Sequence, residues 1–373
     1  MMNKKRVVIS VISDLVTDQR VHRTATTLHK LGFDVLLVGR QLPNSAQMDV
    51  RAYPTKRFKL PVNKGVLFYA FYNIRLFLFL LFQKTDLLFA NDLDTLPANY
   101  LISKWKRKKL IYDSHEYFTG VPELVARPNV QRIWKWLEKK IVPKLDHLIT
   151  VNHSIANLFE KEYGKQFVVI RNLPVTKTVT LKKSRAEFGI PEGKSVFLFQ
   201  GAGINIDRGA EEAIEAISHV DAILLFIGGG DVLDSLQKLV REKNLEQKVF
   251  FIPKQPMELL IAFTSLADFG LTLDKDTNIN YRFSLPNKLF DYIQARLPIL
   301  ASDLPEVSAI VKGYEIGIVT ASHDPLALAE EMKNMMNNEK FARWKENLNL
   351  AASELCWEKE ESKLIELITN ATD

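Results

Sequence analysis

Two series of short apolar runs alternating with helical segments constrain the fold of this 373-residue chain more than any other feature. In the first half the β-branched runs predict strands at 7–13, 34–38, 87–90, 110–112 and 147–151. In the second half the same pattern predicts strands at 196–200, 222–227, 248–252, 269–272 and 299–302. Alternating strands and helices indicate parallel sheets with right-handed crossovers. The sequence therefore predicts an α/β protein with two doubly wound, Rossmann-like domains.

A last strand of the first series, at 167–170, ends just before Leu173, where we place the domain boundary. We expect an N-terminal domain over 1–173 and a C-terminal domain over 174–351, followed by a final helix at about 352–373. The tail from 325 to 372 is expected to be helical. Its apolar residues are spaced for two faces, Leu326, Leu328, Met332, Met335 and Met336 on one and Leu355, Leu364, Ile365 and Ile368 on the other. Parallel sheets bind ligands at the carboxyl ends of their strands, so we expect the active site in a cleft that the two domains face.

Composition and charge narrow the class of protein. Apolar residues make up 47% and charged residues 25% of the chain, as in soluble globular proteins. The single cysteine, Cys356, excludes a disulfide framework or a cysteine-bound metal cluster and fits the cytoplasm. Residues 1–180 hold 29 Lys and Arg against 14 Asp and Glu, whereas 181–373 hold 21 against 30. A basic first half is compatible with anionic lipid or a polyanionic substrate, and without a zinc-finger, RNP or basic-zipper pattern we expect no nucleic acid.

The segment 284–301 has the pattern of a loop feeding into a helix that ends before a buried strand. Pro286 suits the start of a helix, where its missing N–H would be unpaired anyway, and the first-turn N–H groups can bind an anion. Lys288 adds a full positive charge, and Asp291 can accept hydrogen bonds from two ribose hydroxyls. The segment thus fits a nucleotide-binding site, while an ordinary capped helix with a surface lysine is the alternative.

This segment resembles the donor-nucleotide motif of family 4 glycosyltransferases, in the variant Ser-x-Pro-x-Lys-x-Phe-Glu-Tyr followed by a Pro-Val-Ile-like strand. Glycine turns follow strands 196–200 and 222–227, and the first is similar to the turn with which the family holds donor phosphates. Glycine lets the backbone approach a diphosphate, and an arginine at the next helix can neutralise it. The resemblance implies that the donor is bound by Gly201, Gly203, Asn205, Arg208, Gly228, Gly230, Pro286, Asn287, Lys288 and Asp291.

The first domain opens with a segment similar to the family's Asp-x-Arg-Val-x-Arg-x-Ala signature, carried here by Asp18, Arg20 and Arg23. We expect Asp18 to cap a helix that ends at Gly32 in a left-handed conformation. The two arginines share a helix face and could hold an acceptor phosphate. The alternative is that they pair with Asp14 and Asp18 and only order the loop.

His115 and Glu116 follow strand 110–112 and resemble the family's Tyr-Asp-x-His-Glu stretch. A histidine there can bond a donor-sugar hydroxyl or move a proton, and the glutamate can hold an acceptor hydroxyl, so both are predicted catalytic residues. A His–Glu pair that only anchors the loop is the alternative. Asp92 follows strand 87–90 on the same rim, where it would either bind the acceptor or cap the next helix.

The segment 65–82 is apolar nearly all round and nearly long enough to cross a bilayer. Asn73 and Arg75 interrupt its centre, which disfavours a span. Its second apolar face, with basic residues expected nearby, favours shallow docking on an anionic membrane. Plain burial and an oligomer interface stay open as alternatives.

Together, these motifs predict a GT-B-fold glycosyltransferase of the hexosyltransferase type. The resemblance implies a nucleoside-diphosphate sugar donor, a saccharide or lipid-linked acceptor in cell-surface polysaccharide synthesis, retention of configuration, and no metal or other cofactor. It also implies that the first domain binds the acceptor and the second the donor, and that the last helix, at about 352–373, crosses back to the first domain. Phe283 stands where the family carries the first glutamate of a Glu-x7-Glu pair. We expect a cytoplasmic location, with peripheral contact at the inner membrane face. A nucleotide-sugar 2-epimerase of the same architecture and a non-catalytic sugar-nucleotide-binding or membrane-scaffold protein are the alternatives.

Overall fold

The computed structural model describes residues 4–176, 183–337 and 339–372, and the chain forms two compact units. The first comprises Met1–Asn172 with Glu360–Asp373, and the second comprises Leu173–Lys359. Residues 1–3 and 373, which the predicted domain limits include, lie outside the described residues. The last helix, α15 (Trp357–Thr372), starts in the second unit and contributes most of its length to the first.

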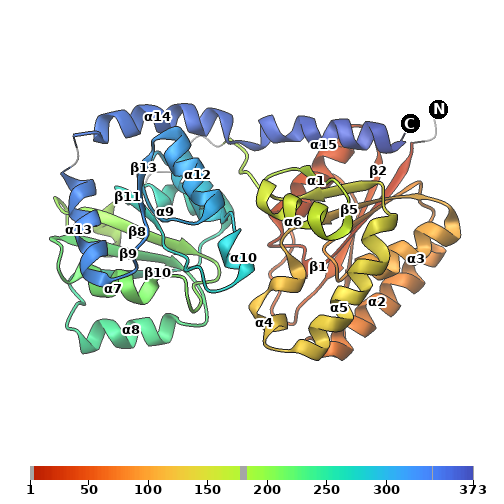
Figure 1. The fold of residues 1–373 in the computed structure, drawn as a ribbon, viewed down its shortest axis with the longest axis horizontal. Coiled ribbons are helices and arrows are strands. Elements are labelled where there is room, and N and C mark those ends of the chain that lie inside the picture. Colours follow the sequence, from red (N-terminus) through yellow and green to blue (C-terminus); the bar gives the residue numbers. More distant parts are fainter. Residues whose placement is uncertain (1–3, 177–182, 338, 373) are drawn as a thin grey trace. The chain divides into compact units, whose positions relative to one another are not determined.

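The described part of the first unit contains a parallel sheet of seven strands in the order β3-β2-β1-β4-β5-β6-β7 (Figure 1). Its strands are β1 (Arg6–Asp14), β2 (Asp34–Arg40), β3 (Thr55–Phe58), β4 (Leu87–Asn91), β5 (Lys109–Ser114), β6 (His147–Thr150) and β7 (Val168–Val169). Its helices are α1 (Gln19–Lys30), α2 (Gly65–Phe82), α3 (Leu96–Lys106), α4 (Pro122–Val125), α5 (Pro128–Ile141) and α6 (His153–Tyr163), with short 3-10 turns η1 (Phe118–Gly120) and η2 (Val142–Lys144). Figure 1 shows α2, α3 and α5 on one face of this sheet and α1 with the C-terminal part of α15 on the other.

The segment from β1 to β2 forms the helix that the sequence predicts, with Asp18 at its start and Gly32 just after its end. Asp18 is the N-cap of α1, and its side chain accepts a hydrogen bond from the Val21 N–H at 3.0 Å. Val21 and Leu28 are fully buried, and Gly32, just after the helix, has φ 89°, which confirms the predicted left-handed turn. Glu361 of α15 accepts a hydrogen bond from the Thr27 hydroxyl at 2.5 Å, which ties the last helix to α1.

The described part of the second unit contains a parallel sheet of six strands in the order β10-β9-β8-β11-β12-β13. Its strands are β8 (Ser195–Gly201), β9 (Ala222–Gly228), β10 (Val249–Pro253), β11 (Phe269–Thr272), β12 (Ile299–Ser302) and β13 (Gly317–Thr320). Its helices are α7 (Ala210–Ile217), α8 (Leu233–Glu242), α9 (Met257–Thr264), α10 (Ile279–Arg282), α11 (Asn287–Gln294), α12 (Pro305–Tyr314), α13 (Pro325–Met336) and α14 (Phe341–Glu354), with a 3-10 turn η3 (Arg185–Phe188).

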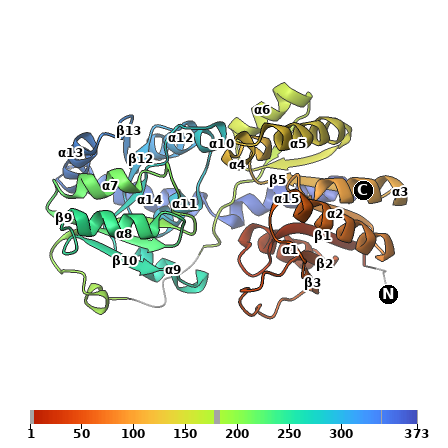
Figure 2. The same cartoon turned by 90° about the horizontal axis from the view of Figure 1, so that it is seen from below.

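Both faces of the second sheet are covered by helices, so its strands are buried on both sides (Figure 2). Helices α7, α8 and α13 enclose one apolar core, and α9, α11, α12 and α14 enclose the other. This arrangement leaves the strand ends as the places where polar loop residues gather.

The predicted fold class, two doubly wound parallel sheets, is confirmed. The sequence missed two edge strands, β3 and β13. β3 has only four residues, of which Phe58 alone is apolar, and β13 starts at Gly317, where an added Cβ would overlap the carbonyl oxygen of Ile299. The expected helical tail is three helices, and Leu326, expected on the buried face, is 59% exposed because it lies opposite the side of α13 that buries Leu328 and Met332.

Candidate active site

Polar side chains of Asn91, Asp92, Asp113 and His115 gather at the carboxyl ends of β4 and β5 in the first unit. This group is called the first half-site. Asp92 follows β4 with a left-handed backbone, φ 59°, and its Oδ1 accepts a hydrogen bond from the backbone N–H of His115 at 2.8 Å. The imidazole of His115 lies between two carboxylates, with Nδ1 3.2 Å from Oδ2 of Asp92 and Nε2 3.3 Å from Oδ2 of Asp113. Oδ1 of Asn91 lies 3.2 Å from the same Nε2. The structure therefore brings the predicted residues Asp92 and His115 together.

Arg20 links α1 to this half-site through a buried ion pair. Its Nε and Nη2 donate to the two carboxylate oxygens of Asp113 at 2.9 and 2.7 Å, and its Nη1 donates to the carbonyl of Ile170 at 2.8 Å. Both charged side chains are buried, and such two-point pairs are among the stronger polar contacts. The expectation that Arg20 pairs with Asp14 or Asp18 was wrong, because the fold brings β5 closer to it than its own loop.

The other residues of the first signature have separate roles. Asp18 caps α1 and also accepts a hydrogen bond from the Ser13 hydroxyl at 2.5 Å. Arg23 donates from Nη2 to Oδ1 of Asn172, so it ties α1 to the end of the first unit. Asp14 lies 3.7 Å from Nη1 of Arg57. Of the four predicted acceptor-binding residues, Asp18, Arg20 and Arg23 thus lie on α1 and at its N-cap, whereas Asp92 follows β4. Each of the four has a partner inside the first unit.

The electrostatics of this half-site favour a charged imidazole. Burial alone would lower the pKa of His115, but the carboxylates of Asp92 and Asp113 raise it to about 9. Burial would raise the pKa of Asp113, yet Arg20 and His115 hold it well below its usual range. Burial raises the pKa of Asp92, an effect that His115 opposes. The cluster therefore carries a positive imidazolium at neutral pH, with Arg20 as its second cation.

Asp92 does not cap the next helix. The N-cap of α3 is Thr95, without a side-chain capping bond, and the Asp92 carboxylate is directed at His115 instead. Glu116, the other predicted catalytic residue, follows His115 and is partly exposed, and its backbone carbonyl accepts a hydrogen bond from the Ser114 hydroxyl at 2.8 Å.

The second half-site forms around Asp274, which follows β11 in the second unit. Nη1 of Arg208 lies 2.7 Å from its Oδ2, and Nζ of Lys288 lies 3.1 Å from its Oδ1. The Arg208 guanidinium also stacks on the Tyr281 ring at 4.1 Å, and the Lys288 ammonium lies 4.7 Å from the centre of the Phe199 ring. Burial lowers the pKa of Lys288, and Asp274 opposes that shift. The two predicted phosphate-binding cations are thus brought together.

Two glycine turns follow β8 and β9, at the same end of the second sheet as Asp274. The Ile204 N–H donates to the carbonyl of Gly229 at 2.8 Å, and the Asp231 N–H donates to Oδ1 of Asn205 at 3.2 Å, so the turns after β8 and β9 are bonded to each other. Gly228 has φ 141°, and a Cβ there would overlap the carbonyl oxygen of Gly201. Glycine is therefore required at Gly228 by this contact.

Gly201 and Gly203 behave differently from Gly228. A Cβ on Gly201 would come no closer than 3.5 Å to the Ile204 side chain, and one on Gly203 no closer than 3.6 Å to Asn205. Packing within the unit therefore does not require glycine at either position. Gly230, with φ 157°, resembles Gly228, since its Cβ would overlap the backbone of Ile204.

The predicted nucleotide helix is α11. Pro286 is its N-cap with φ −72° and ψ 142°, and Asn287 is its first residue. One turn on, Oδ2 of Asp291 accepts a hydrogen bond from Nε2 of Gln200 at 2.9 Å. Gln200 in turn accepts from the Thr264 hydroxyl at 2.6 Å, so the Asp291 carboxylate is held at the carboxyl end of β8.

Sequence reasoning missed Asp274, Asp113 and Gln200 as site residues. Asp274 lies two residues after the predicted strand 269–272, so the rule that ligands gather at strand ends could have found it. Asp94 was also missed as a buried group, and burial together with Asp92 raises its pKa well above the ordinary value. Among the described residues, no three His, Cys, Asp or Glu side chains gather as a metal site requires.

Comparison with known proteins agrees with this architecture. The family described as Glycosyltransferase Family 4 matches residues 18–173, and the family described as Glycosyl transferases group 1 matches residues 181–349. Chitobiosyldiphosphodolichol beta-mannosyltransferase of Candida glabrata is 22% identical, over 95% of this chain and 91% of its own length.

Two solved structures have the same fold. Sucrose-phosphate synthase of Thermosynechococcus elongatus superposes with a TM-score of 0.79 at 16% identity, covering 98% of this chain and 99% of that one. HepE of Anabaena, solved in complex with UDP and glucose, gives a TM-score of 0.73 at 14% identity, covering 98% of this chain and 100% of its own.

Two Rossmann-like units of seven and six parallel strands define a protein of the GT-B fold. The chain belongs to the family 4-like glycosyltransferases of this fold. The predicted family is confirmed, and so is the prediction of a glycosyltransferase.

Proposed function

We propose that this glycosyltransferase moves a hexosyl group from a nucleoside-diphosphate sugar to a saccharide or lipid-linked acceptor in cell-surface polysaccharide synthesis. The reaction proceeds with retention and without a metal or other cofactor. One observation carries the proposal: Arg208 and Lys288, from different segments of the second unit, converge on one carboxylate beside two glycine turns.

The donor diphosphate binds where these two cations meet. A leaving nucleoside diphosphate gains negative charge as the sugar departs, and fixed cations stabilise that charge most when they need no rearrangement. Asp274 keeps Arg208 and Lys288 in place before the donor binds. Packing does not require glycine at Gly201 or Gly203, and the missing side chains suit close approach of phosphate oxygens to the backbone. Asp291, held by Gln200, accepts hydrogen bonds from the ribose hydroxyls.

In the transfer step, a hydroxyl of the acceptor forms the new bond to the anomeric carbon as the bond to the diphosphate oxygen breaks. The departing diphosphate takes the hydroxyl proton, so no separate base is needed. His115 positions the sugar through Nε2, whose contacts of 3.2 and 3.3 Å are longer than charge-assisted bonds usually are, so a sugar hydroxyl can compete for it. Glu116 holds the acceptor hydroxyl, with Asp18, Arg20, Arg23 and Asp92 as the predicted acceptor-binding residues.

The relatives support the substrate classes. The Candida glabrata relative is named as a transferase that uses a diphosphodolichol-linked acceptor, and HepE was solved with UDP and glucose. These names support the two substrate classes proposed for the present chain, a lipid-linked saccharide as acceptor and a nucleoside-diphosphate sugar as donor.

Helix α2 supports the proposed peripheral contact with an anionic membrane. Among the described residues it is the one helix long and apolar enough to cross a membrane by length and composition, yet only 22% of it is buried. It buries every fourth residue, Phe68, Tyr72, Leu76 and Leu80, and exposes Val66, Leu67, Phe71, Ile74, Leu78 and Phe82. Burial within the chain therefore explains one side of α2 only.

The two polar residues of α2 are both bonded within the chain, although Arg75 is exposed beside Ile74. Asn73 donates to the carbonyls of Tyr69 and Asp94, and Arg75 donates to the carbonyl of Lys59 while its guanidinium covers the Phe58 ring. An outward apolar face on a basic unit is typical of helices that lie in a membrane interface.

The experiment is a thermal-shift titration with UDP, GDP and ADP, followed by a transfer assay with the matching sugar nucleotides and added EDTA. Arg208→Ala and Lys288→Ala should each weaken nucleoside diphosphate binding about tenfold or more, because each removes a charge-assisted bond to phosphate. Arg185→Ala is the matched control, since Arg185 forms an ion pair with Asp268 at 2.8 Å beside the amino ends of β8 and β11. Unchanged affinity in both site variants would refute the assignment, and tight nucleotide binding without transfer would favour a non-catalytic protein.

A further inference from the structure

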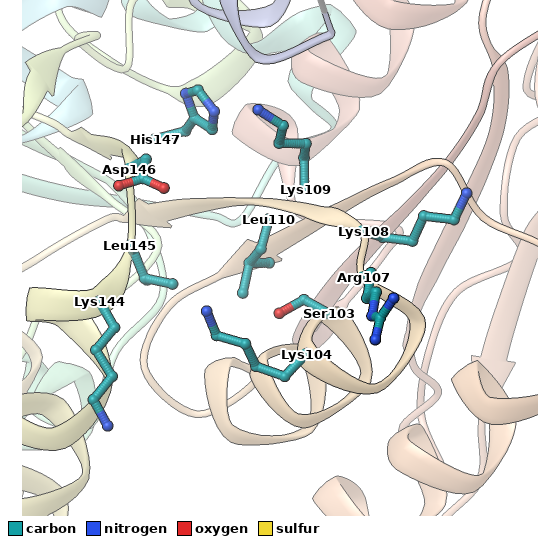
Figure 3. A pocket seen from close by; sticks show the side chains of 10 residues that line it. All are labelled: Ser103, Lys104, Arg107, Lys108, Lys109, Leu110, Lys144, Leu145, Asp146 and His147. Carbon is teal, nitrogen blue, oxygen red and sulfur yellow. The ribbon is translucent and has the colours of Figure 1, made fainter.

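A basic cavity of about 280 Å³ lies in the first unit (Figure 3). Its walls come from the end of α3, the start of β5 and the segment from η2 to the start of β6. β5 and β6 run parallel, so the cavity lies at their amino ends, whereas His115 follows the carboxyl end of β5. The cavity is thus separate from the first half-site.

Cations dominate the lining of this cavity. Its charged residues are Lys104, Arg107, Lys108, Lys109 and Lys144 against a single acid, Asp146. Lys108 is engaged with Asp86 at 3.1 Å, and Figure 3 shows it pointing away from Lys104 and Lys144. Within the described residues, Lys104, Arg107 and Lys144 form no ion pair. Three like charges without counter-ions gain stability from a bound anion.

These cations are not needed to complete the ends of neighbouring helices. The backbone N–H groups of Arg107 and Lys108 already bond to the last carbonyls of α3, those of Lys104 and Ser103. Lys106, which does not line the cavity, donates to the carbonyls of Leu80 and Gln83 at the end of α2. The free positive charge of the cavity is therefore available to a ligand.

The surroundings of the cavity indicate where the anion comes from. On α3, Trp105 is 68% exposed and Leu101 is 56% exposed, and Trp105 lies against Phe77 of α2 with ring centres 6.4 Å apart. Exposed tryptophan beside basic and apolar side chains is typical of the membrane–water interface. The volume is near the lower limit of small-molecule pockets, which suits a head group better than a whole substrate.

We propose that this cavity binds the phosphate of an anionic phospholipid head group and so fixes which part of the α2–α3 surface meets the membrane. The inference rests on the proposed membrane contact of α2. Lys104, Arg107 and Lys144 supply the positive charge that attracts the phosphate, while Trp105 and the exposed side of α2 enter the acyl boundary.

The test is vesicle co-sedimentation of the full chain with phosphatidylcholine alone and with phosphatidylglycerol added. The triple variant Lys104→Gln, Arg107→Gln, Lys144→Gln should lose binding to the anionic vesicles about tenfold or more. The matched control is Lys135→Gln, Lys139→Gln, Lys140→Gln, which removes the same charge from exposed positions on α5. If the cavity is a specific site, this control should lose clearly less binding. Equal losses in the two variants would overturn the proposed head-group site and would indicate general electrostatic attraction between a basic surface and the vesicles.

A second arm separates the sources of phosphate. Inorganic phosphate is titrated without vesicles, at constant ionic strength, while backbone amide signals of residues 104–109 and 144–147 are followed by NMR. Saturable phosphate binding in the cavity combined with unchanged vesicle binding of the cavity variant would overturn the lipid assignment. Nucleoside diphosphate binding, measured on the same variants, should stay unchanged because the donor half-site lies in the second unit. If the wild-type chain bound no nucleotide but bound anionic vesicles through the cavity, the donor proposal would fail and the head-group site would stand.

Discussion

Arg208 and Lys288 bind opposite oxygens of the same buried carboxylate, with Nη1 of Arg208 2.7 Å from Oδ2 of Asp274 and Nζ of Lys288 3.1 Å from Oδ1. The carboxylate therefore fixes the spacing of two cations before any anion is bound. An incoming diphosphate meets positive charge that is already positioned, and little reorganisation opposes its binding.

Replacement of Asp274 by Asn should expose this dependence. The amide keeps the shape of the side chain but leaves Lys288 buried without a counter-charge, and removing one partner of a buried ion pair costs about 3–5 kcal/mol. The free energy of unfolding, measured by urea denaturation, should therefore fall by roughly 3 kcal/mol. Saturating UDP or GDP should restore more stability to the variant than to the wild type, because phosphate oxygens then supply the missing charge. An equal ligand effect in both proteins would contradict a phosphate site at these cations.

Local sequence patterns predicted the strands and the loops that follow them, which led to His115 and Asp92 at strand ends. The motifs shared with the family pointed to Arg208, just before α7, and Lys288, in the first turn of α11. The partners of these residues depended on tertiary structure. Asp113 lies 93 residues from Arg20 in the sequence, and a sequence gives no sign that it is nearer than Asp14 or Asp18. Asp274 joins two cations that local patterns found separately.

The edge strands show a different limit of the sequence. β3 pairs with β2 alone and β13 with β12 alone, so neither needs the apolar runs that identify strands in the middle of a sheet. Helix α2 shows the opposite limit. Its apolar pattern is plain in the sequence, but only the structure shows how few of its residues are buried.

The Arg20–Asp113 pair should be strongly coupled. Arg20→Gln and Asp113→Asn should each lower the free energy of unfolding by about 3 kcal/mol, since each leaves a buried charge unpaired. The double variant should cost less than the two single changes together, which a double-mutant cycle measures directly. The control cycle uses Lys312 and Asp303, an exposed pair 3.1 Å apart, whose coupling should be below about 1 kcal/mol. Coupling of similar size in both cycles would argue against a special role for the buried pair.

His115 should keep its proton well above neutral pH. Its pKa is raised to about 9 in the folded protein from an ordinary value of 6.5, so its contribution to stability is full below pH 6.5 and is lost as the pH rises through 9. NMR of the imidazole nitrogens should report this titration. Asp92→Asn should lower the pKa by about one unit or more, since the charge of Asp92 is the largest single effect that raises it. A titration near pH 6.5 in the wild type would show that the carboxylates do not hold the charge.

Glu138, buried in α5, should give the first unit a stability that falls as the pH rises. Its Oε2 accepts hydrogen bonds from the Tyr163 and Thr119 hydroxyls at 2.8 and 3.4 Å, and within the described residues Oε1 has no partner. Burial raises the pKa of Glu138 from 4.5 to about 7, with Glu162 adding to the shift. Between these two values the unfolded chain releases the proton while the folded chain keeps it, so stability declines across that range and levels off above pH 7.

The change from Glu138 to Gln removes this titration. Below pH 4.5 the variant and the wild type should be similarly stable, and above pH 7 the variant should be more stable by roughly 1–3 kcal/mol, because the wild type then holds a buried, partly unpaired carboxylate. Urea denaturation of both proteins across the range measures the difference between the two curves, which cancels the titration of all other groups. Glu123→Gln, an exposed position on α4, is the control and should give parallel curves. If the Glu138 variant also ran parallel to the wild type, the carboxyl group would have to titrate in the folded protein as it does in the unfolded chain.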